Sequence, residues 1–412
     1  MSDALSVLAA AAEVPDAPAV ILEDRVLTFA EVAAALPPAG ERARIATPAL
    51  DTVLAIYAAL AERAPLALLH PKLAPAELAR QADVVTAAAL PADAAVVLFT
   101  SGSTAAARGV VLSRAALLAN ARASAAHLPL TTADRWLLAL SLAHSGGLSV
   151  LTRCLVARAP IVLETGASRL ARATLASLVP TQLAALLDDP AWRPPPALRA
   201  ILLGGAAASP ALLAAARARG VPVRTTYGLT ETFGQVATAL DETSAPTPLP
   251  GVTLLAGTAA APAPIRVRGP MLATSYLDGA PIAPELVTAD LGYLDATGAL
   301  HIAGRADDVI ITGGENVHPA AVEAVLATTP GVRAALAFGV ADARWGQLVA
   351  VALAVADPAA FDLAAAAAHW RTGLPSHALP RRLALVTALP QGVTGKLDRR
   401  AAAALPGVPV RY

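Results

Sequence analysis

The sequence predicts an α/β protein: a large N-terminal domain of parallel-rich sheets flanked by helices, with a small β unit, followed by a small α+β C-terminal domain. Over roughly 200 residues, short β-branched or leucine-rich runs alternate with long Ala/Leu/Arg stretches, the pattern of parallel sheets with helices on both faces. After Ser244, Pro and Gly punctuate much shorter segments, which predicts the β-rich unit.

The individual elements follow from these runs. Strands are expected near 94–100, 161–163, 200–203 and 221–225, and helices over 113–127, 169–177 and 211–219. The alanine-rich stretches are read as helices because alanine has the best helix propensity and leucines recur in them at helical spacing. Beyond residue 308 the expected order is a helix over 319–328, strands near 333–340 and 348–355, and a helix over 362–373.

A change of texture at Gly304-Arg305-Ala306-Asp307-Asp308 predicts the domain boundary. The predicted domains are therefore 1–305, with a β-rich subdomain over 245–305, and 306–412. Ligands of parallel sheets bind beyond the carboxyl ends of the strands, so the polar turns that follow predicted strands are the candidate sites.

Composition excludes several classes of protein. Hydrophobic content is 56% and mean hydropathy is +0.57, but most of this is alanine, and no apolar run reaches the ~18 residues of a spanning helix. Met1-Ser2-Asp3-Ala4 carries no basic charge, so no signal peptide is expected. The 31 acidic and 31 basic residues balance, without the basic runs of nucleic-acid or membrane-surface proteins. Because the charge pattern argues against nucleic acid and membrane surfaces, the expected partner is a small molecule. The single cysteine, Cys154, is expected to be a buried apolar residue and fits a reducing cytoplasm.

Lysine is rare in this chain. Lys72 and Lys396 are the only lysines among 31 basic residues, and Lys396 lies in the turn Thr394-Gly395-Lys396. A compact ammonium can enter a site and contact one oxygen, whereas guanidinium is a broad fork. Lys396 is thus a candidate for chemistry that arginine cannot perform. Drift is the alternative, and Lys72 in a His-Pro-Lys-Leu loop is an ordinary lysine.

Two Ser/Thr-rich turns follow predicted strands. The first, Thr100 to Thr104, is expected to lead into a helix and offers N–H groups and hydroxyls to phosphate, with Arg108 nearby, although such a turn alone also fits an ordinary loop. In the second, 225–232, Tyr227 beside glycine can stack on a base. Glu231 there can hold Mg²⁺, or it is a solvated surface acid.

Two later turns complete the set. Asp290, in Thr288-Ala289-Asp290, is a carboxylate that can accept ribose hydroxyls, and Arg305 follows it in 304–308. The glycine turn that begins at Gly313 permits close approach of a ligand to the backbone.

Together, the five motifs, in this order and at these spacings, resemble the adenylate-forming superfamily of acyl-CoA ligases, luciferases and peptide-synthetase adenylation domains. The resemblance covers essentially the whole chain. Within the superfamily, the segments 134–140, 144–148, 177–183, 203–206 and 226–238 are similar to o-succinylbenzoate–CoA ligases of menaquinone biosynthesis.

The resemblance implies an enzyme that uses ATP, Mg²⁺ and CoA. A carboxylate would attack the α-phosphate of ATP to give acyl-AMP and pyrophosphate, and the thiol of CoA would then displace AMP. Lys396 would bridge the acyl carboxylate and the α-phosphate, Glu231 would serve Mg²⁺, and Asp290 with Arg305 would bind ribose. Asp307 matches the hinge about which a mobile C-terminal domain rotates. The other implied nucleotide contacts are Thr100, Ser101, Gly102, Ser103, Thr104, Arg108, Gly204, Gly205, Thr226, Tyr227, Gly228 and Thr230, and the CoA-facing turn is Gly313, Gly314, Glu315 and Asn316.

The acyl pocket is implied at His144, Arg153 and Gly228. His144 lies where the family has a gate between the ATP and acyl pockets, or it is a buried structural histidine. Arg153, nine residues on, suits bidentate recognition of the second carboxylate of a succinyl group. A helix-surface arginine is the alternative.

The chain departs from the family pattern in its phosphate loop. Ala105, Ala107 and Arg108 replace the usual Gly, Pro and Lys, which puts the closing motion of the loop in doubt but not the fold.

The expected function is ligation of o-succinylbenzoate to CoA by a cytoplasmic enzyme. A homodimer is a weaker expectation. Alternatives with the same chemistry are a ligase for another aromatic or short acyl acid, or a stand-alone adenylation domain that loads a carrier protein. An alternative of another class is a nucleotide-binding protein without turnover.

Overall fold

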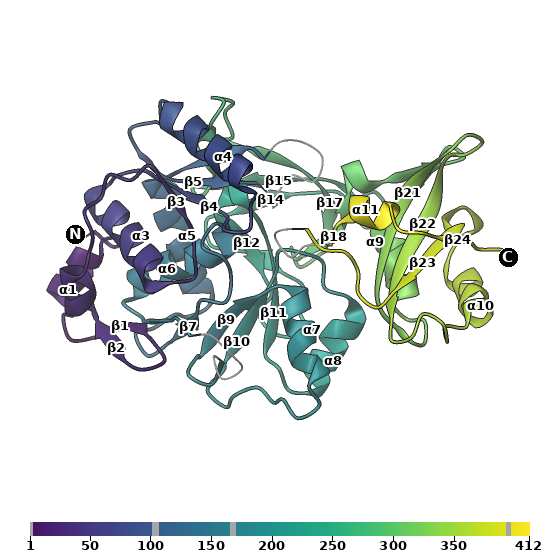
Figure 1. Ribbon diagram of the computed structural model, residues 1–412, viewed down its shortest axis with the longest axis horizontal. Helices are drawn as coiled ribbons and strands as arrows, with labels where there is room; N and C mark the ends of the chain where they lie inside the picture. The colour runs from purple at the N-terminus through teal and green to yellow at the C-terminus, as the bar shows by residue number, and fades with distance from the viewer. Residues whose placement is uncertain (1–2, 101–106, 165–169, 393–396) are drawn as a thin grey trace. The chain divides into compact units, whose positions relative to one another are not determined.

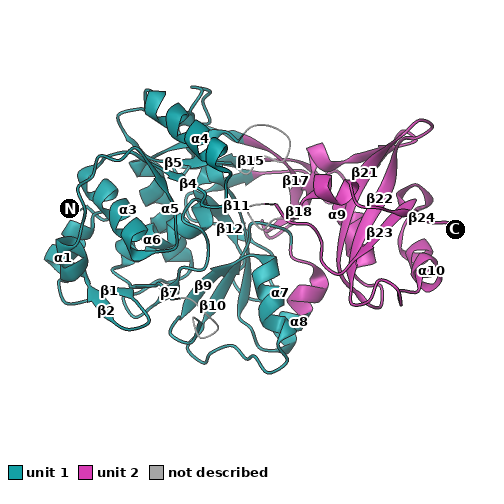
Figure 2. Ribbon diagram, viewed as in Figure 1, with its two compact units in different colours: residues 1–207, 215–254, 267–286 teal, residues 208–214, 255–266, 287–412 magenta. Residues whose placement is uncertain are grey.

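The computed structural model describes residues 3–100, 107–164, 170–392 and 397–412 (Figure 1). The chain divides into two compact units, of which unit 1 comprises residues 1–207, 215–254 and 267–286, and unit 2 comprises residues 208–214, 255–266 and 287–412 (Figure 2). Within the described residues, no helix combines the length and apolarity needed to cross a membrane.

The larger sheet of unit 1 has nine strands in the described residues, in the order β13-β12-β11-β10-β9-β7-β8-β1-β2. Its central strands from β11 through β10, β9, β7 and β8 to β1 are parallel, as predicted. The strands are β1 (Pro18–Ile21), β2 (Val26–Thr28), β7 (Trp136–Leu137), β8 (Ile161–Val162), β9 (Leu175–Leu178), β10 (Ala200–Leu203), β11 (Val223–Leu229), β12 (Gly234–Thr238) and β13 (Thr247–Pro248).

The second sheet of unit 1 has the order β16-β6-β5-β4-β3. Strands β3 (Ala43–Ile45), β4 (Leu66–Leu69) and β5 (Ala94–Phe99) are parallel, and β6 (Gly109–Ser113) and β16 (Ser275–Tyr276) join antiparallel.

Two helices pack against each other, and α5 contacts both of these sheets while α6 contacts the nine-stranded sheet. Helix α5 (Arg114–His127) contacts β5 and β6 of the five-stranded sheet and β12 of the nine-stranded sheet, while α6 (Ser145–Ala157) contacts β7, β8 and β12. Cys154 on α6 is buried as predicted, and burial raises the pKa of its thiol. The remaining helices up to residue 218 are α1 (Val7–Glu13), α2 (Phe29–Ala34), α3 (Leu50–Glu62), α4 (Pro75–Ala87), α7 (Pro180–Asp188) and α8 (Pro210–Ala218).

Unit 2 contains the mixed α+β part of the chain. Its C-terminal sheet has the order β20-β19-β22-β23-β24, with β21 also paired to β22. Trp370 is buried in its core and donates from Nε1 to Thr329 Oγ1 at 2.9 Å. The elements are β19 (Ile310–Thr312), β20 (Glu315–Val317), α9 (Pro319–Leu326), β21 (Val332–Asp342), β22 (Gly346–Val355), α10 (Leu363–Gly373), β23 (Arg382–Val386), α11 (Arg399–Ala403) and β24 (Val408–Pro409).

A further sheet has the order β14-β15-β17-β18. Its strands are β14 (Thr253–Leu255), β15 (Ala263–Arg268), β17 (Leu286–Leu294) and β18 (Leu300–Arg305). The α/β class, with a large N-terminal and a small C-terminal part, is confirmed. The predicted domain boundary near Arg305 stays a prediction.

Two predicted elements are wrong, and one predicted strand has different bounds. Where a helix is predicted over 169–177, the structure has the strand β9 (Leu175–Leu178). This short run is fully buried, and periodicity cannot distinguish a strand from a helix in such a run. The turn after β5 leads into strand β6 rather than into a helix, because Val110 and Val111 pair with β5, and α5 begins only at Arg114. The strand predicted over 221–225 extends to Leu229, because β12 folds back and pairs with its second half.

Candidate active site

The predicted phosphate loop connects the antiparallel strands β5 and β6. Thr100 donates its N–H to the Arg108 carbonyl at 2.9 Å, and Arg108 donates its N–H to Thr100 Oγ1 at 3.2 Å. These bonds close the two ends of the connection like a hairpin. Ser101, Gly102, Ser103 and Thr104 lie outside the described residues, and so does Ala105.

Arg108 is the cation predicted to contact phosphate. Its Nη2 donates to Asp278 Oδ2 at 2.9 Å, and its guanidinium lies 3.5 Å from the centroid of the Tyr276 ring. Hydrogen bonds from the Ala280 N–H and from Arg108 lower the pKa of Asp278. A phosphate at Arg108 therefore has to compete with, or add to, this ion pair.

Strand β11 carries the predicted base- and phosphate-binding residues. Tyr227 is partly buried and lies opposite Ala237 of β12. The Thr226 hydroxyl donates to the Ala237 carbonyl at 3.0 Å, so its proton serves the strand pairing. Gly204, which follows β10 and precedes Gly205 (φ +78°), packs on Thr226: a Cβ at Gly204 would lie 2.7 Å from Thr226 Cγ2.

Glu231 lies one residue into the short 3₁₀ turn Thr230–Thr232 that follows β11. Its Oε1 accepts a hydrogen bond from the Tyr276 hydroxyl at 3.1 Å, and its carbonyl accepts the Ala273 N–H. Among the described residues, no group of three or more His, Cys, Asp or Glu side chains has the placement of a metal cage. A single carboxylate suits Mg²⁺, which keeps several waters and is bound through one or two carboxylates plus substrate phosphates. The donor set at Glu231 fits that ion.

His144 is the N-cap residue of α6 and lies beside a second histidine. The rings of His144 and His70 are 5.0 Å apart between centroids and tilted by 35°. His70 Nδ1 accepts the Lys72 N–H at 3.2 Å, so the neutral ring carries its proton on Nε2. Burial, followed by the charge of Lys72, lowers the pKa of His70 and favours that neutral form.

Arg153, on α6, is only 2% exposed, so the alternative of a helix-surface arginine is wrong. Its Nη2 is 3.5 Å from Asn120 Oδ1, and its guanidinium carbon is 5.2 Å from the centroid of the Trp136 ring. Within the described ranges no carboxylate pairs with it, and its Nε has no hydrogen-bond partner there. Burial lowers the pKa of Arg153, yet a guanidinium keeps its charge at neutral pH. The result is a buried cation without an anion, an arrangement that is costly unless a ligand supplies the charge.

In unit 2, the predicted ribose and hinge residues form one cluster. Asp290 and Arg305 are directly opposite each other on β17 and β18, with Arg305 Nη1 3.2 Å from Asp290 Oδ1. Arg305 also donates from Nε and Nη2 to the two oxygens of Asp307, both at 2.9 Å. This fork raises the pKa of Arg305 and lowers that of Asp307.

The predicted CoA-facing turn joins β19 to β20 in unit 2. Gly313 and Gly314 have φ of +60° and +86°, and Glu315 and Asn316 are exposed on β20. Trp345, 47% exposed, packs on this turn: a Cβ at Gly313 would lie 2.7 Å from its ring. Only glycine satisfies both conditions there.

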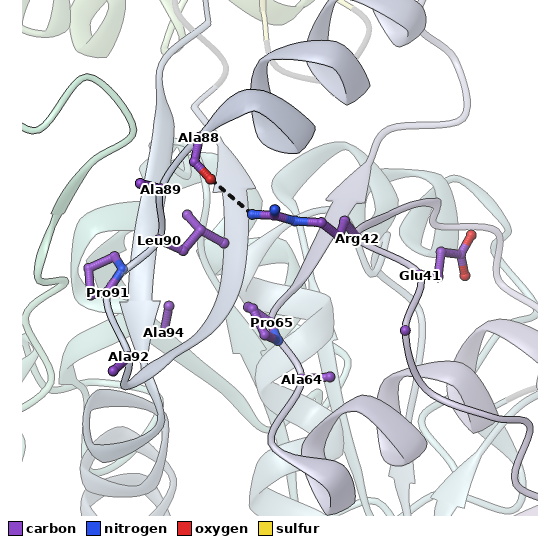
Figure 3. Close-up of a pocket in the computed structure, with 11 residues that line it drawn as sticks. Glu41, Arg42, Ala64, Pro65, Ala88, Ala89, Leu90, Pro91, Ala92 and Ala94 are labelled. Atoms are coloured by element: carbon purple, nitrogen blue, oxygen red, sulfur yellow. Dashed lines mark hydrogen bonds between the residues drawn. The ribbon is translucent and has the colours of Figure 1, made fainter.

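A pocket of about 470 Å³ lies at the opposite edge of the five-stranded sheet, where the residues preceding β3, β4 and β5 line it (Figure 3). Arg42 Nη2 donates there to the Ala88 carbonyl at 3.0 Å (Figure 3). Because parallel sheets bind ligands beyond the carboxyl ends of their strands, this pocket is separate from the candidate site.

Comparison with known proteins agrees with the motifs. The sequence profile of the AMP-binding enzyme family matches residues 46–277, and that of the AMP-binding enzyme C-terminal domain matches residues 321–396. The chain belongs to the AMP-binding enzyme family. The resemblance inferred from the motifs is thereby confirmed.

Relatives within the family are similar over most of their length. The chain is 40% identical over 335 residues to a probable 2-succinylbenzoate–CoA ligase of Mycobacterium tuberculosis, covering 75% of this chain and 84% of that protein. It is 34% identical to the 2-succinylbenzoate–CoA ligase of Geobacillus kaustophilus, covering 75% and 68%. The structure of Bacillus subtilis o-succinylbenzoate CoA synthetase with its acyl-adenylate intermediate superposes with a TM-score of 0.84 at 27% identity, covering 98% and 99%.

Some functional candidates of this AMP-binding enzyme were missed from sequence. No sequence motif points to His70 or to Tyr276. A usable signal existed for His70: it follows β4 as Thr100 follows β5, and these strands are parallel neighbours. Lys396, which the sequence predicts to be a catalytic residue, lies outside the described residues.

Gly228, which follows Tyr227, allows a test of the packing between β11 and β12. A Cβ at this position would lie 1.9 Å from the Gly234 carbonyl oxygen. We expect Gly228→Ala to force β11 and β12 apart, to cost roughly 1–3 kcal/mol in the free energy of unfolding, and to weaken ATP binding by displacing Tyr227. Chemical denaturation and calorimetric ATP titration measure both effects.

Gly146→Ala is the matched control, since the atom its Cβ would meet is the end of the flexible Leu140 side chain, at 3.0 Å. An unchanged stability of Gly228→Ala would contradict the tight packing of the two strands.

Proposed function

We propose that this protein is an ATP-dependent ligase that joins o-succinylbenzoate to CoA through an acyl-AMP intermediate, with release of AMP and pyrophosphate. The buried cation Arg153 carries the proposal from the structure, because no carboxylate of the described residues pairs with it and a substrate with a second carboxylate supplies that anion. The named activities of the relatives above support the same substrate.

In the first step, a carboxylate oxygen of the acid attacks the α-phosphorus of ATP, the new O–P bond forms, and pyrophosphate leaves. The side chains of β11 and the turn after it, with Tyr227 and Glu231, hold the nucleotide. Lys396 neutralises the charge that accumulates between the acyl carboxylate and the α-phosphate, where a preorganised donor acts most strongly. Glu231 would hold Mg²⁺, which would supply positive charge beside the phosphates of ATP.

In the second step, the sulfur of CoA attacks the acyl carbon and AMP leaves with the bonding electrons. His144 gates the acyl pocket between these steps, Asp290 and Arg305 hold the ribose, and Gly313 to Asn316 face CoA. Asp307 acts as the hinge residue between the two half-reactions. Its paired contact with Arg305 supports a defined starting geometry for that hinge.

The test is mass spectrometry of the products formed from MgATP, CoA and a panel of acids that includes o-succinylbenzoate. We expect a single thioester, o-succinylbenzoyl-CoA. Thioesters from other acids alone would replace the substrate assignment, and acyl-AMP without a thioester would indicate a carrier protein as the acceptor. ATP binding without pyrophosphate release would indicate a nucleotide-binding protein without turnover.

We further propose a cytoplasmic location, which the single cysteine supports, and a homodimer, which the family resemblance supports. Light scattering after size-exclusion chromatography tests the dimer.

A further inference from the structure

Tyr276 connects two residues of the candidate site that are far apart in the sequence. It lies on β16, which pairs antiparallel with β6 and places Tyr276 opposite Val110, two residues beyond Arg108. The neighbouring bond from the Leu277 N–H to the Gly109 carbonyl, at 2.8 Å, holds this register. The segment from Ser275 to Asp278 therefore lies beside the strand that follows Arg108.

The hydroxyl of Tyr276 is directed at the candidate metal ligand. It donates to Glu231 Oε1 at 3.1 Å. A carboxylate oxygen can only accept, so the phenol hydroxyl is the donor in this hydrogen bond. A hydrogen bond from the phenol to one carboxylate oxygen orients the carboxylate group, and with it the second oxygen.

The ring of Tyr276 contacts the candidate phosphate cation. The Arg108 guanidinium lies over its face, 3.5 Å from the centroid, within the range of a cation–π contact. Arg108 is also paired with Asp278, two residues after Tyr276. One side chain thus contacts a metal-ligand candidate through its hydroxyl and a phosphate-ligand candidate through its ring.

An ordinary structural tyrosine is the simpler explanation, since a buried hydroxyl usually finds a partner. Tyr57 is a structural tyrosine, fully buried in the core of unit 1. Tyr276 differs in two respects: it is only partly buried, and both of its polar contacts are to charged side chains. A purely structural packing role requires neither of these charged contacts.

We propose that Tyr276 is a positioning residue, whose hydroxyl orients the Glu231 carboxylate for Mg²⁺ while its ring holds Arg108 for the phosphates of ATP. The proposal rests on the role of Glu231 under the proposed function and on the phosphate contact that the sequence predicts for Arg108. Partners that orient a metal ligand typically contribute roughly 10–100-fold to metal affinity or activity.

The test separates the hydroxyl from the ring. Tyr276→Phe keeps the ring, and we expect it to raise the dissociation constant of Mn²⁺ about 10-fold, measured by electron paramagnetic resonance with a non-hydrolysable ATP analogue. Binding of the analogue without metal should stay unchanged. Tyr276→Leu removes the ring as well, so it should weaken binding of the ATP analogue even when no metal is present.

Two matched variants complete the design. Asp278→Asn removes the ion pair of Arg108 but leaves the hydroxyl, so Mn²⁺ affinity should stay at the wild-type value. Tyr293→Phe removes a hydroxyl in unit 2, where Tyr293 stacks on His301 at 4.7 Å, and should also leave Mn²⁺ affinity unchanged.

Wild-type Mn²⁺ affinity in Tyr276→Phe would overturn the proposal, and so would an equal loss in Tyr293→Phe or absence of Mn²⁺ binding to the wild-type complex. Because no acid or CoA is present, a wrong acyl substrate leaves this result readable. The proposed function fails separately, through the absence of o-succinylbenzoyl-CoA.

Discussion

Replacing Arg153 by methionine is expected to lower kcat/KM for o-succinylbenzoate by roughly 10²–10³, because loss of a buried charge-assisted pair costs about 2–5 kcal/mol. The loss should be specific to the second carboxylate. Turnover of an acid that lacks the succinyl carboxylate, however slow, should not fall by the same factor. Steady-state kinetics with the two acids measures the difference.

The same substitution is expected to stabilise the ligand-free protein. Arg153 is a buried cation that no carboxylate pairs with in the described part of the chain, and methionine fills a similar space without the desolvation cost. Thermal unfolding should therefore show a higher Tm for Arg153→Met than for the wild type. With o-succinylbenzoate added, only the wild type should gain stability, since ligand binding to the folded state raises Tm.

Arg158 is the matched control on the same helix. It caps the C-terminus of α6, donates to the Leu155 carbonyl at 2.6 Å and pairs with Glu13 at 2.8 Å. Arg158→Met should lower Tm and leave the preference between the two acids unchanged. If Arg153→Met lost stability in the same way and slowed both acids equally, Arg153 would be a structural residue.

Lys396→Ala is expected to slow formation of acyl-AMP by roughly 10²–10³, which corresponds to about 3–4 kcal/mol for one preorganised donor. The effect should be confined to the first step, because negative charge accumulates at the α-phosphorus only there. Pyrophosphate exchange measures that step, and thioester formation from supplied acyl-AMP measures the second. Lys396→Arg should not restore the rate, since a planar fork does not replace a compact ammonium.

Lys72→Ala is the control, because Lys72 is the only other lysine in the sequence. Its hydrogen bond to His70 uses the backbone N–H, which alanine retains. A normal exchange rate in Lys396→Ala would remove this residue from the mechanism and leave its rarity as drift.

The family and the fold class were accessible from sequence because their signals are local. The order and spacing of the motifs around Thr100, Glu231, Asp290 and Lys396 identify an AMP-binding enzyme without any knowledge of packing. Alternation of apolar runs with alanine-rich stretches indicates parallel sheets and helices for the same reason. The prediction was wrong where local pattern was ambiguous, at β9 and β6, because pairing with a neighbouring strand decided the outcome there.

The three-dimensional structure was needed for everything that depends on residues distant in the chain. From its sequence context alone, Arg153 could equally be an arginine on the surface of a helix. The packing of α6 against α5 and β7 buries it, and no carboxylate of the described residues pairs with it. His70 reaches His144, and Tyr276 reaches both Arg108 and Glu231, through tertiary contacts that no sequence motif encodes. Burial and contacts between distant residues set the free energy of a charge in its site. They therefore decide which of the predicted polar residues already have hydrogen-bond or ion-pair partners in the protein and which need a ligand to supply one.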